Sequence, residues 1–215
     1  RSQLASPIIL FPERPFVRDK FAERVKKTVQ ERGYCTVVVS EGIRNPDGEF
    51  VSDQGSKDAF GHSQLGGVAP YIAEIIRSET GFKYHWAVAD YLQRSARHIA
   101  SRTDVDHAYR VGSAAVEFAT QGENAIMPII VRTRNSPYEW KIGKTALDNV
   151  ANLEKKLPET FISDDGYGVT EDCLKYLKPL IEGEDYPPYL NGIPSYASLR
   201  NQLVQRKLRD DFAID

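Results

Sequence analysis

Residues 36–39 form a continuous run of β-branched side chains, and this run constrains the fold more than any other part of the chain. A strand that is apolar on both faces must be covered on both sides, which is typical of a parallel sheet between helices. The run follows a helical pattern at residues 17–32, where Phe21 and Val25 lie four apart and Gly33 supplies a stop. This succession predicts an α/β unit.

Similar segments continue along the chain. Further strands are expected at 8–11, 83–88, 125–131 and 138–142. Further helices are expected around 68–80 and at 103–120, and a polar, glycine-rich loop at 42–63. In the helix at 103–120 the side chains expected to face inward are Ala108, Val111, Ala115, Phe118 and Ala119. Because strands alternate with helices of this length, the predicted fold class is α/β, a Rossmann-like three-layer domain with a largely parallel sheet.

The chain changes character after residue 157, where Pro, Tyr and Gly become frequent. Helical patterns recur only at 170–180 and 196–207. We therefore expect residues 1–157 to form the α/β domain and residues 158–215 to form a C-terminal extension that packs on its core.

The composition excludes several classes of function. The chain has 215 residues and a net charge of −2, which argues against binding nucleic acid mainly by electrostatics. No run of about 18 apolar residues is present, so no membrane span is expected. Cys35 and Cys173 are isolated, which predicts reduced thiols and a cytoplasmic location. The four histidines lack zinc-site spacing, and no metal site is expected in this chain.

Two loops that directly follow expected strands carry side chains suited to a ligand. Glu13 offers a carboxylate that can accept hydrogen bonds from sugar hydroxyls. The segment 89–98 offers Tyr91, Arg94, Arg97 and a histidine, and the planar guanidinium fork of arginine matches phosphate. Residues 58–67 open a helix and form a third candidate, because helix N-termini attract anions. Taken alone, the first two loops are better explained as ordinary solvated surface, and the third is at least as well explained as a loop-to-helix transition with packing glycines.

The order of these segments resembles the C-terminal half of the phosphofructokinases. Residues 12–16 (Pro-Glu-Arg-Pro-Phe) are similar to the family's P-E-x-x-F element, and residues 35–42 are similar to its V-V-V-S-E-G strand. Residues 91–94 (Tyr-Leu-Gln-Arg) stand where the family has H-I-Q-R-G-G, or Y-x-x-R in many pyrophosphate-dependent members. The loop 58–67 and the tail around 176–194 also resemble the pyrophosphate-dependent branch.

The resemblance implies a role for particular residues. Glu13 would accept hydrogen bonds from hydroxyls of fructose 6-phosphate, and Tyr91 and Arg94 would bind its 6-phosphate. His85 corresponds to an arginine that reaches the substrate of a neighbouring subunit in tetrameric relatives, so a homo-oligomer, dimer or tetramer, is expected. Residues 1–157 would then be the sugar-phosphate-binding domain of a phosphofructokinase fold, with residues 158–215 wrapping it.

The resemblance also implies an activity for a longer protein. That enzyme would transfer phosphate from pyrophosphate to fructose 6-phosphate in glycolysis, giving fructose 1,6-bisphosphate with the help of Mg²⁺. The family's P-K-T-I-D-like, glycine-rich and M-G-R motifs are missing from this sequence. They precede the P-E-x-x-F element in the family, so we expect the catalytic residues and most Mg²⁺ ligands to precede residue 1, and this chain alone to be inactive.

Three alternatives remain open from the sequence. The first is an ATP-dependent phosphofructokinase of unusual sequence. The second is a non-catalytic sugar-phosphate-binding module of the same fold. The third is a generic flavodoxin-like binding domain.

Overall fold

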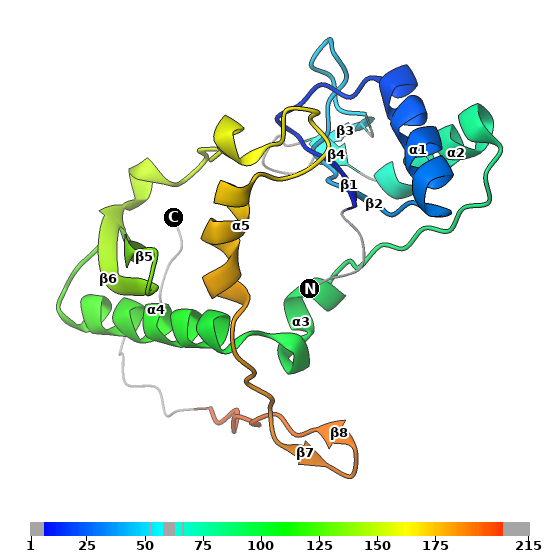
Figure 1. The fold of residues 1–215 in the computed structure, drawn as a ribbon. Coiled ribbons are helices and arrows are strands. Elements are labelled where there is room, and N and C mark those ends of the chain that lie inside the picture. Colours follow the sequence, from blue (N-terminus) through cyan, green and yellow to red (C-terminus); the bar gives the residue numbers. More distant parts are fainter. Residues whose placement is uncertain (1–6, 52, 58–62, 66, 204–215) are drawn as a thin grey trace.

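The computed structural model describes residues 7–51, 53–57, 63–65 and 67–203. Figure 1 shows two groups of elements, one built around the first helices and strands and one built around a long helix and a hairpin. The helix α5 (Glu171–Leu177) lies between the two groups (Figure 1). In the described part of the chain, no helix is both long enough and apolar enough to cross a membrane.

The first group is the predicted α/β unit. Strands β1 (Ile8–Leu10) and β2 (Val37–Val39) pair in parallel, and helix α1 (Arg18–Arg32) connects them. Helix α2 (Val68–Thr80) packs against α1. The buried side chains of this group form one apolar core, made of Ile8, Leu10, Phe16, Phe21, Val25, Ile43, Val68, Ile72 and Ile75.

The helix ends follow the chemistry expected of them. Gly33 adopts φ 79°, and its N–H donates to the carbonyl of Val29 at 2.8 Å, so the predicted stop of α1 is confirmed. Gly81 closes α2 in the same way, with φ 70° and a bond to the carbonyl of Arg77. A residue with a side chain would be strained in this left-handed conformation, which is why glycine marks both ends.

The region predicted as a polar loop contains one strand, and a second strand begins at its last residue. β3 (Asp53–Lys57) and β4 (Ser63–Leu65) pair in the antiparallel sense, with Asp53 opposite Leu65. Residues 58–62, which include much of the third candidate loop, lie outside the described residues.

The prediction of a strand at 83–88 is wrong. This segment carries no sheet pairing, and β2 pairs with β1 alone among the described strands. The reason is physical: an apolar run predicts an extended path, but a strand also needs a neighbour at hydrogen-bonding distance. Here a cleft separates the segment from β2.

The second group consists of α4 (Arg102–Thr120), β5 (Ile126–Arg134) and β6 (Glu139–Ala146). β5 and β6 form an antiparallel hairpin, and each strand begins one residue after its expected start and extends beyond its expected end. Ser101 caps α4, since its Oγ accepts from the N–H of Asp104 at 3.1 Å and donates to the carbonyl of Leu180 at 2.7 Å. The pairs β3–β4, β5–β6 and β7–β8 are antiparallel, beside the parallel pair β1–β2.

The inward face predicted for α4 is partly wrong. Val111 and Phe118 are half-buried, but Ala108, Ala115 and Ala119 are exposed, and the buried alanine is Ala114. Alanine is small enough to suit either face of a helix, so the spacing of alanines does not identify the face that packs on the hairpin.

Short elements complete the chain. They are α3 (Leu92–Ser95), η1 (Arg97–Ile99), η2 (Leu147–Asn149), η3 (Glu159–Phe161), η4 (Lys178–Ile181), β7 (Tyr189–Leu190) and β8 (Ile193–Pro194). The helix expected at 170–180 is confirmed by α5 and η4. The helix expected at 196–207 is wrong for residues 196–203, which are not helical, and its remainder lies outside the described residues.

The segment after residue 157 returns to the first group. Ile9 donates its N–H to the carbonyl of Tyr167 at 2.9 Å, and Ile162 is buried. Arg24 of α1 forms an ion pair with Asp165 at 3.1 Å. These contacts tie the early extension to β1 and α1, while the domain boundary at residue 157 stays a prediction.

Asp165 makes the contact between the C-terminal extension and α1 sensitive to pH. Its Oδ1 accepts from the Ser163 hydroxyl at 2.6 Å and from the N–H of Tyr167 at 3.1 Å. The Ser163 hydrogen bond is the main cause that lowers the pKa of Asp165, helped by Tyr167 and Arg24 and opposed by burial. Because the pKa of Asp165 is lower in the folded state, its ionised carboxylate stabilises the fold at any pH above the unfolded-state pKa of about 3.9. This stabilisation is lost as the pH falls through the folded-state pKa.

We therefore expect Asp165→Asn to lower the free energy of unfolding by about 1 kcal/mol at pH 7, since the group is half exposed. The difference from wild type should shrink below about pH 4. Urea unfolding at pH 7 and at pH 3 measures the difference in unfolding free energy between wild type and variant, and Asp164→Asn is the neighbouring control. An equal loss at both pH values would contradict this assignment.

Candidate functional site

Two turns meet where the parallel strands end. The turn after β1 carries Glu13, and the turn after β2 carries Ser40, Glu41 and Gly42. A Cβ atom on Gly42 would lie 3.4 Å from Cγ of Pro12, so the two turns are in close contact. Sequence reasoning placed the Glu13 loop at the carboxyl end of a strand, where α/β proteins bind ligands, and β1 confirms this placement. It placed the loop 89–98 in the same way, but the segment 83–88 that precedes this loop is not a strand.

Glu13 is half-buried and already holds one backbone partner. Its Oε1 accepts the N–H of Leu157 at 2.8 Å, which links the turn to the start of the C-terminal extension. A carboxylate has two oxygen atoms and about four acceptor positions, so this bond leaves capacity for ligand hydroxyls.

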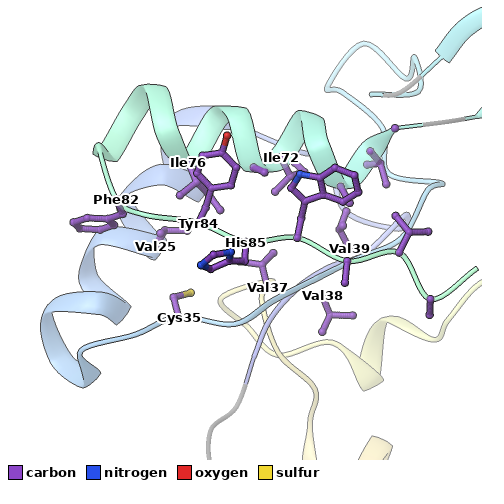
Figure 2. A pocket seen from close by; sticks show the side chains of 18 of the residues that line it. Val25, Cys35, Val37, Val38, Val39, Ile72, Ile76, Phe82, Tyr84 and His85 are labelled. Carbon is purple, nitrogen blue, oxygen red and sulfur yellow. The ribbon is translucent and has the colours of Figure 1, made fainter.

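A cleft of about 1310 Å³ opens beside β2. Its walls are the end of α1, the strand β2, the helix α2 and the segment 82–91 (Figure 2). Figure 2 shows the ring of His85 between this segment and β2. Trp86 is 54% exposed and Val38 is 50% exposed, so apolar side chains face an open space rather than a packed core.

Two of the predicted site residues line this cleft. His85 and Tyr91 come from the segment 82–91, and Ser40 and Glu41 line it from the end of β2. Glu13 does not line the cleft, although its turn packs against the turn that does. The structure thus brings His85 and Tyr91 into one cavity and places Glu13 on the adjoining turn.

Tyr91 stands at a sharp change of chain direction. Asp90 adopts φ 46°, a left-handed conformation that aspartate tolerates better than most residues. The α3 helix follows, and the carbonyl of Tyr91 accepts from both the N–H and the hydroxyl of Ser95. Sequence reasoning missed Asp90, although an aspartate at the end of an apolar run is a turn signal.

The two arginines of the second candidate loop differ in what the structure shows. Arg97 donates to the carboxylate of Asp185 at 2.5 Å and to the carbonyl of the same residue, so it holds the tail. Arg94 belongs to α3, and its side chain lies outside the described part of the structure. Arg97 is therefore a structural residue, and the role of Arg94 stays a prediction.

Metal ligands are not gathered in the described part of the chain. Among those residues, no group of three or more His, Cys, Asp or Glu side chains is placed to hold a metal ion. Cys35 lies in the wall of the cleft, where burial raises the pKa of its thiol, although Arg24 and Arg32 act in the opposite direction. A thiol with a raised pKa stays protonated at neutral pH and is a poor metal ligand or nucleophile.

Comparison with known proteins finds curated relatives that cover most of this chain. A protein of Methylococcus capsulatus named pyrophosphate–fructose 6-phosphate 1-phosphotransferase is 59% identical over 96% of this chain. A protein of the same name from Halomonas elongata is 55% identical over 94% of it. No family model matches the chain.

Solved structures lead to the same group. A pyrophosphate-dependent phosphofructokinase from Nitrosospira multiformis matches 94% of this chain with a TM-score of 0.80 and 52% identity. The match covers 47% of that protein's chain. The present chain likewise spans about half the length of the curated relatives, 49% of the first and 48% of the second.

Proposed function

Because the chain belongs to the pyrophosphate-dependent phosphofructokinases and shares their fold over about half of their length, we propose that it supplies the fructose 6-phosphate-binding part of such an enzyme. The longer enzyme transfers phosphate from pyrophosphate to the 1-hydroxyl of fructose 6-phosphate. The products are fructose 1,6-bisphosphate and phosphate. A role in cytoplasmic glycolysis is part of the same proposal.

The observation that carries the proposal is the cleft beside β2, which reaches the carboxyl end of that strand. His85 and Tyr91 line it on one side, and Ser40 and Glu41 line it on the other. The Glu13 turn adjoins this end of β2. A phenol, an imidazole and a carboxylate thus line one cleft, and a small polar ligand in an α/β fold is expected near the carboxyl end of a strand.

Each residue has a separate task in this proposal. Glu13 accepts hydrogen bonds from the sugar hydroxyls with its remaining acceptor positions. Tyr91 donates its hydroxyl to the 6-phosphate, and Arg94 adds the charge and the paired donors that a phosphate prefers. His85 serves the phosphate of a substrate held by a neighbouring subunit, which requires a homo-oligomer.

The contribution of this chain to catalysis is positioning. Phosphoryl transfer depends on holding the attacking hydroxyl in line with the donor, and a well-oriented reactant pair gains several orders of magnitude in rate. Mg²⁺ would neutralise charge on the pyrophosphate when bound. We propose that most ligands of this ion belong to the rest of the longer enzyme.

Binding of fructose 6-phosphate tests the proposal directly. We expect Arg94→Ala to weaken binding by about 1.5–3 kcal/mol, the cost of losing a hydrogen bond to a charged group. Isothermal titration calorimetry on the 215-residue chain measures the loss. Arg110→Ala is the matched control, because Arg110 is an exposed arginine whose ion pair is with Asp106 on the same helix. Equal affinity in wild type and Arg94→Ala would refute the assignment.

A further inference from the structure

Arg132 lies in the second group of elements, away from the cleft. It is on β5, and its Nη1 donates to the carbonyl of Tyr176 at the end of α5 at 2.8 Å. The guanidinium carbon lies 4.7 Å from the ring centroid of Tyr138 and 4.9 Å from that of Tyr176. These contacts fix the orientation of the Arg132 guanidinium between the two aromatic rings.

The opposite edge of this guanidinium has no hydrogen-bond partner among the described residues. Nε and Nη2 of Arg132 are both buried and make no hydrogen bond within the described part of the chain. The nearby carboxylate of Glu139 is already paired with Arg134. Buried donors without an acceptor are unfavourable, and a buried charge without a counter-charge is more so.

The aromatic neighbours do not supply the missing charge. Burial raises the pKa of the Tyr138 phenol, although the charge of Arg132 opposes this, so the phenol is neutral at pH 7. Its hydroxyl lies 3.1 Å from Nε2 of His107. The ring of His107 in turn meets the ring of Trp140 at 4.4 Å between centroids.

The two unpartnered donors form a recognisable pattern. Nε and Nη2 lie on the same side of a guanidinium and point their N–H bonds in parallel. This side-on fork matches the two oxygen atoms of a carboxylate or a phosphate group. We propose that this edge of Arg132 is a binding site for a small oxyanion, supplied either by phosphate or by a carboxylate. The site is separate from the cleft and does not depend on the proposed function.

Access to the site requires a local movement. The unpartnered nitrogens are covered, and Tyr138 belongs to the turn between β5 and β6. A bound oxyanion therefore displaces this turn and changes the surroundings of His107 and Trp140. The emission of Trp140 reports that change.

Fluorescence titration of the 215-residue chain tests the proposal. The chain has two tryptophans, so Trp86→Phe leaves Trp140 as the single emitter. Inorganic phosphate, acetate and chloride are titrated separately at constant ionic strength. We expect a saturable change with phosphate or acetate and no saturable change with chloride, and the stronger of the two identifies the oxyanion. Identical linear responses to all three anions would overturn the proposal.

Two substitutions identify the binding group. Arg132→Lys retains the charge but loses the paired donors, and it should weaken binding by roughly tenfold or more. Arg134→Lys is the matched control, because Arg134 is two residues away and already paired with Glu139. Equal affinities in the two variants would also overturn the proposal.

A measurement on the unmodified chain covers the case in which Arg132→Lys does not fold. Crystals of the chain soaked in selenate, an oxyanion with an anomalous signal, should show a peak within hydrogen-bonding distance of Arg132 Nε. Selenate peaks elsewhere with none at Arg132 would show adventitious ions only and would reject the site.

Discussion

The 215-residue chain by itself is expected to form no detectable fructose 1,6-bisphosphate from pyrophosphate and fructose 6-phosphate. The physical reason is that positioning one substrate does not supply the donor site, the base or the charge neutralisation that phosphoryl transfer needs. The chain spans 49% of the length of the Methylococcus capsulatus relative. An aldolase-coupled assay with Mg²⁺ measures the product.

The full-length Methylococcus capsulatus relative is the positive control for this assay. Offering that relative and any longer form of the present protein ATP in place of pyrophosphate tests the choice of donor. Turnover by the 215-residue chain alone would show that the catalytic groups lie within it. The calorimetric titration with Arg94→Ala is independent of this outcome, so loss of binding and loss of chemistry can be told apart.

The second large effect concerns stability. We expect Phe21→Ala to lower the free energy of unfolding by about 3–5 kcal/mol, because removing a buried aromatic ring loses its transfer energy and leaves a cavity. Phe21 is 0% exposed and its ring lies 5.5 Å from that of Phe16. It lies at the centre of the core that α1 forms with β1 and α2.

Urea unfolding followed by far-ultraviolet circular dichroism measures this loss. Tyr109→Ala is the control of similar size, since Tyr109 is 73% exposed on α4 and its removal should change stability by less than about 0.5 kcal/mol. Similar midpoints for the two variants would show that the core does not depend on Phe21. A total stability of about 5–15 kcal/mol is usual for a domain, so the Phe21 variant is expected to be marginal.

The elements that depend on neighbours along the chain were predictable. The spacing of Phe21 and Val25 predicted α1, and Gly33 marked its end, because both signals act within a few residues. The β-branched run predicted β2. Glu13 was correctly placed after a strand by order alone, whereas Tyr91 follows the unpaired segment 83–88 and lies in the cleft.

The elements that depend on distant partners were not predictable in this way. Segment 83–88 has the side chains of a strand but stays across the cleft from β2 without pairing. The alanines of α4 did not identify the buried face, because a small side chain is compatible with either environment. In the sequence, Arg97 and Arg94 are equally good candidates for binding phosphate. The structure shows that Arg97 instead contacts Asp185, which lies 88 residues further along the chain, and so holds the tail.

The sequence by itself determined the α/β elements at the start of the chain, the helix stops and the order of the candidate site residues. Those properties follow from short-range spacing and backbone preference, which a sequence displays directly. The tertiary structure alone decided which strands pair, that Arg97 is held by Asp185, and that one edge of Arg132 has no hydrogen-bond partner among the described residues. Hydrogen bonds and ion pairs between residues far apart in the sequence settle such questions, and they exist only once the chain has folded.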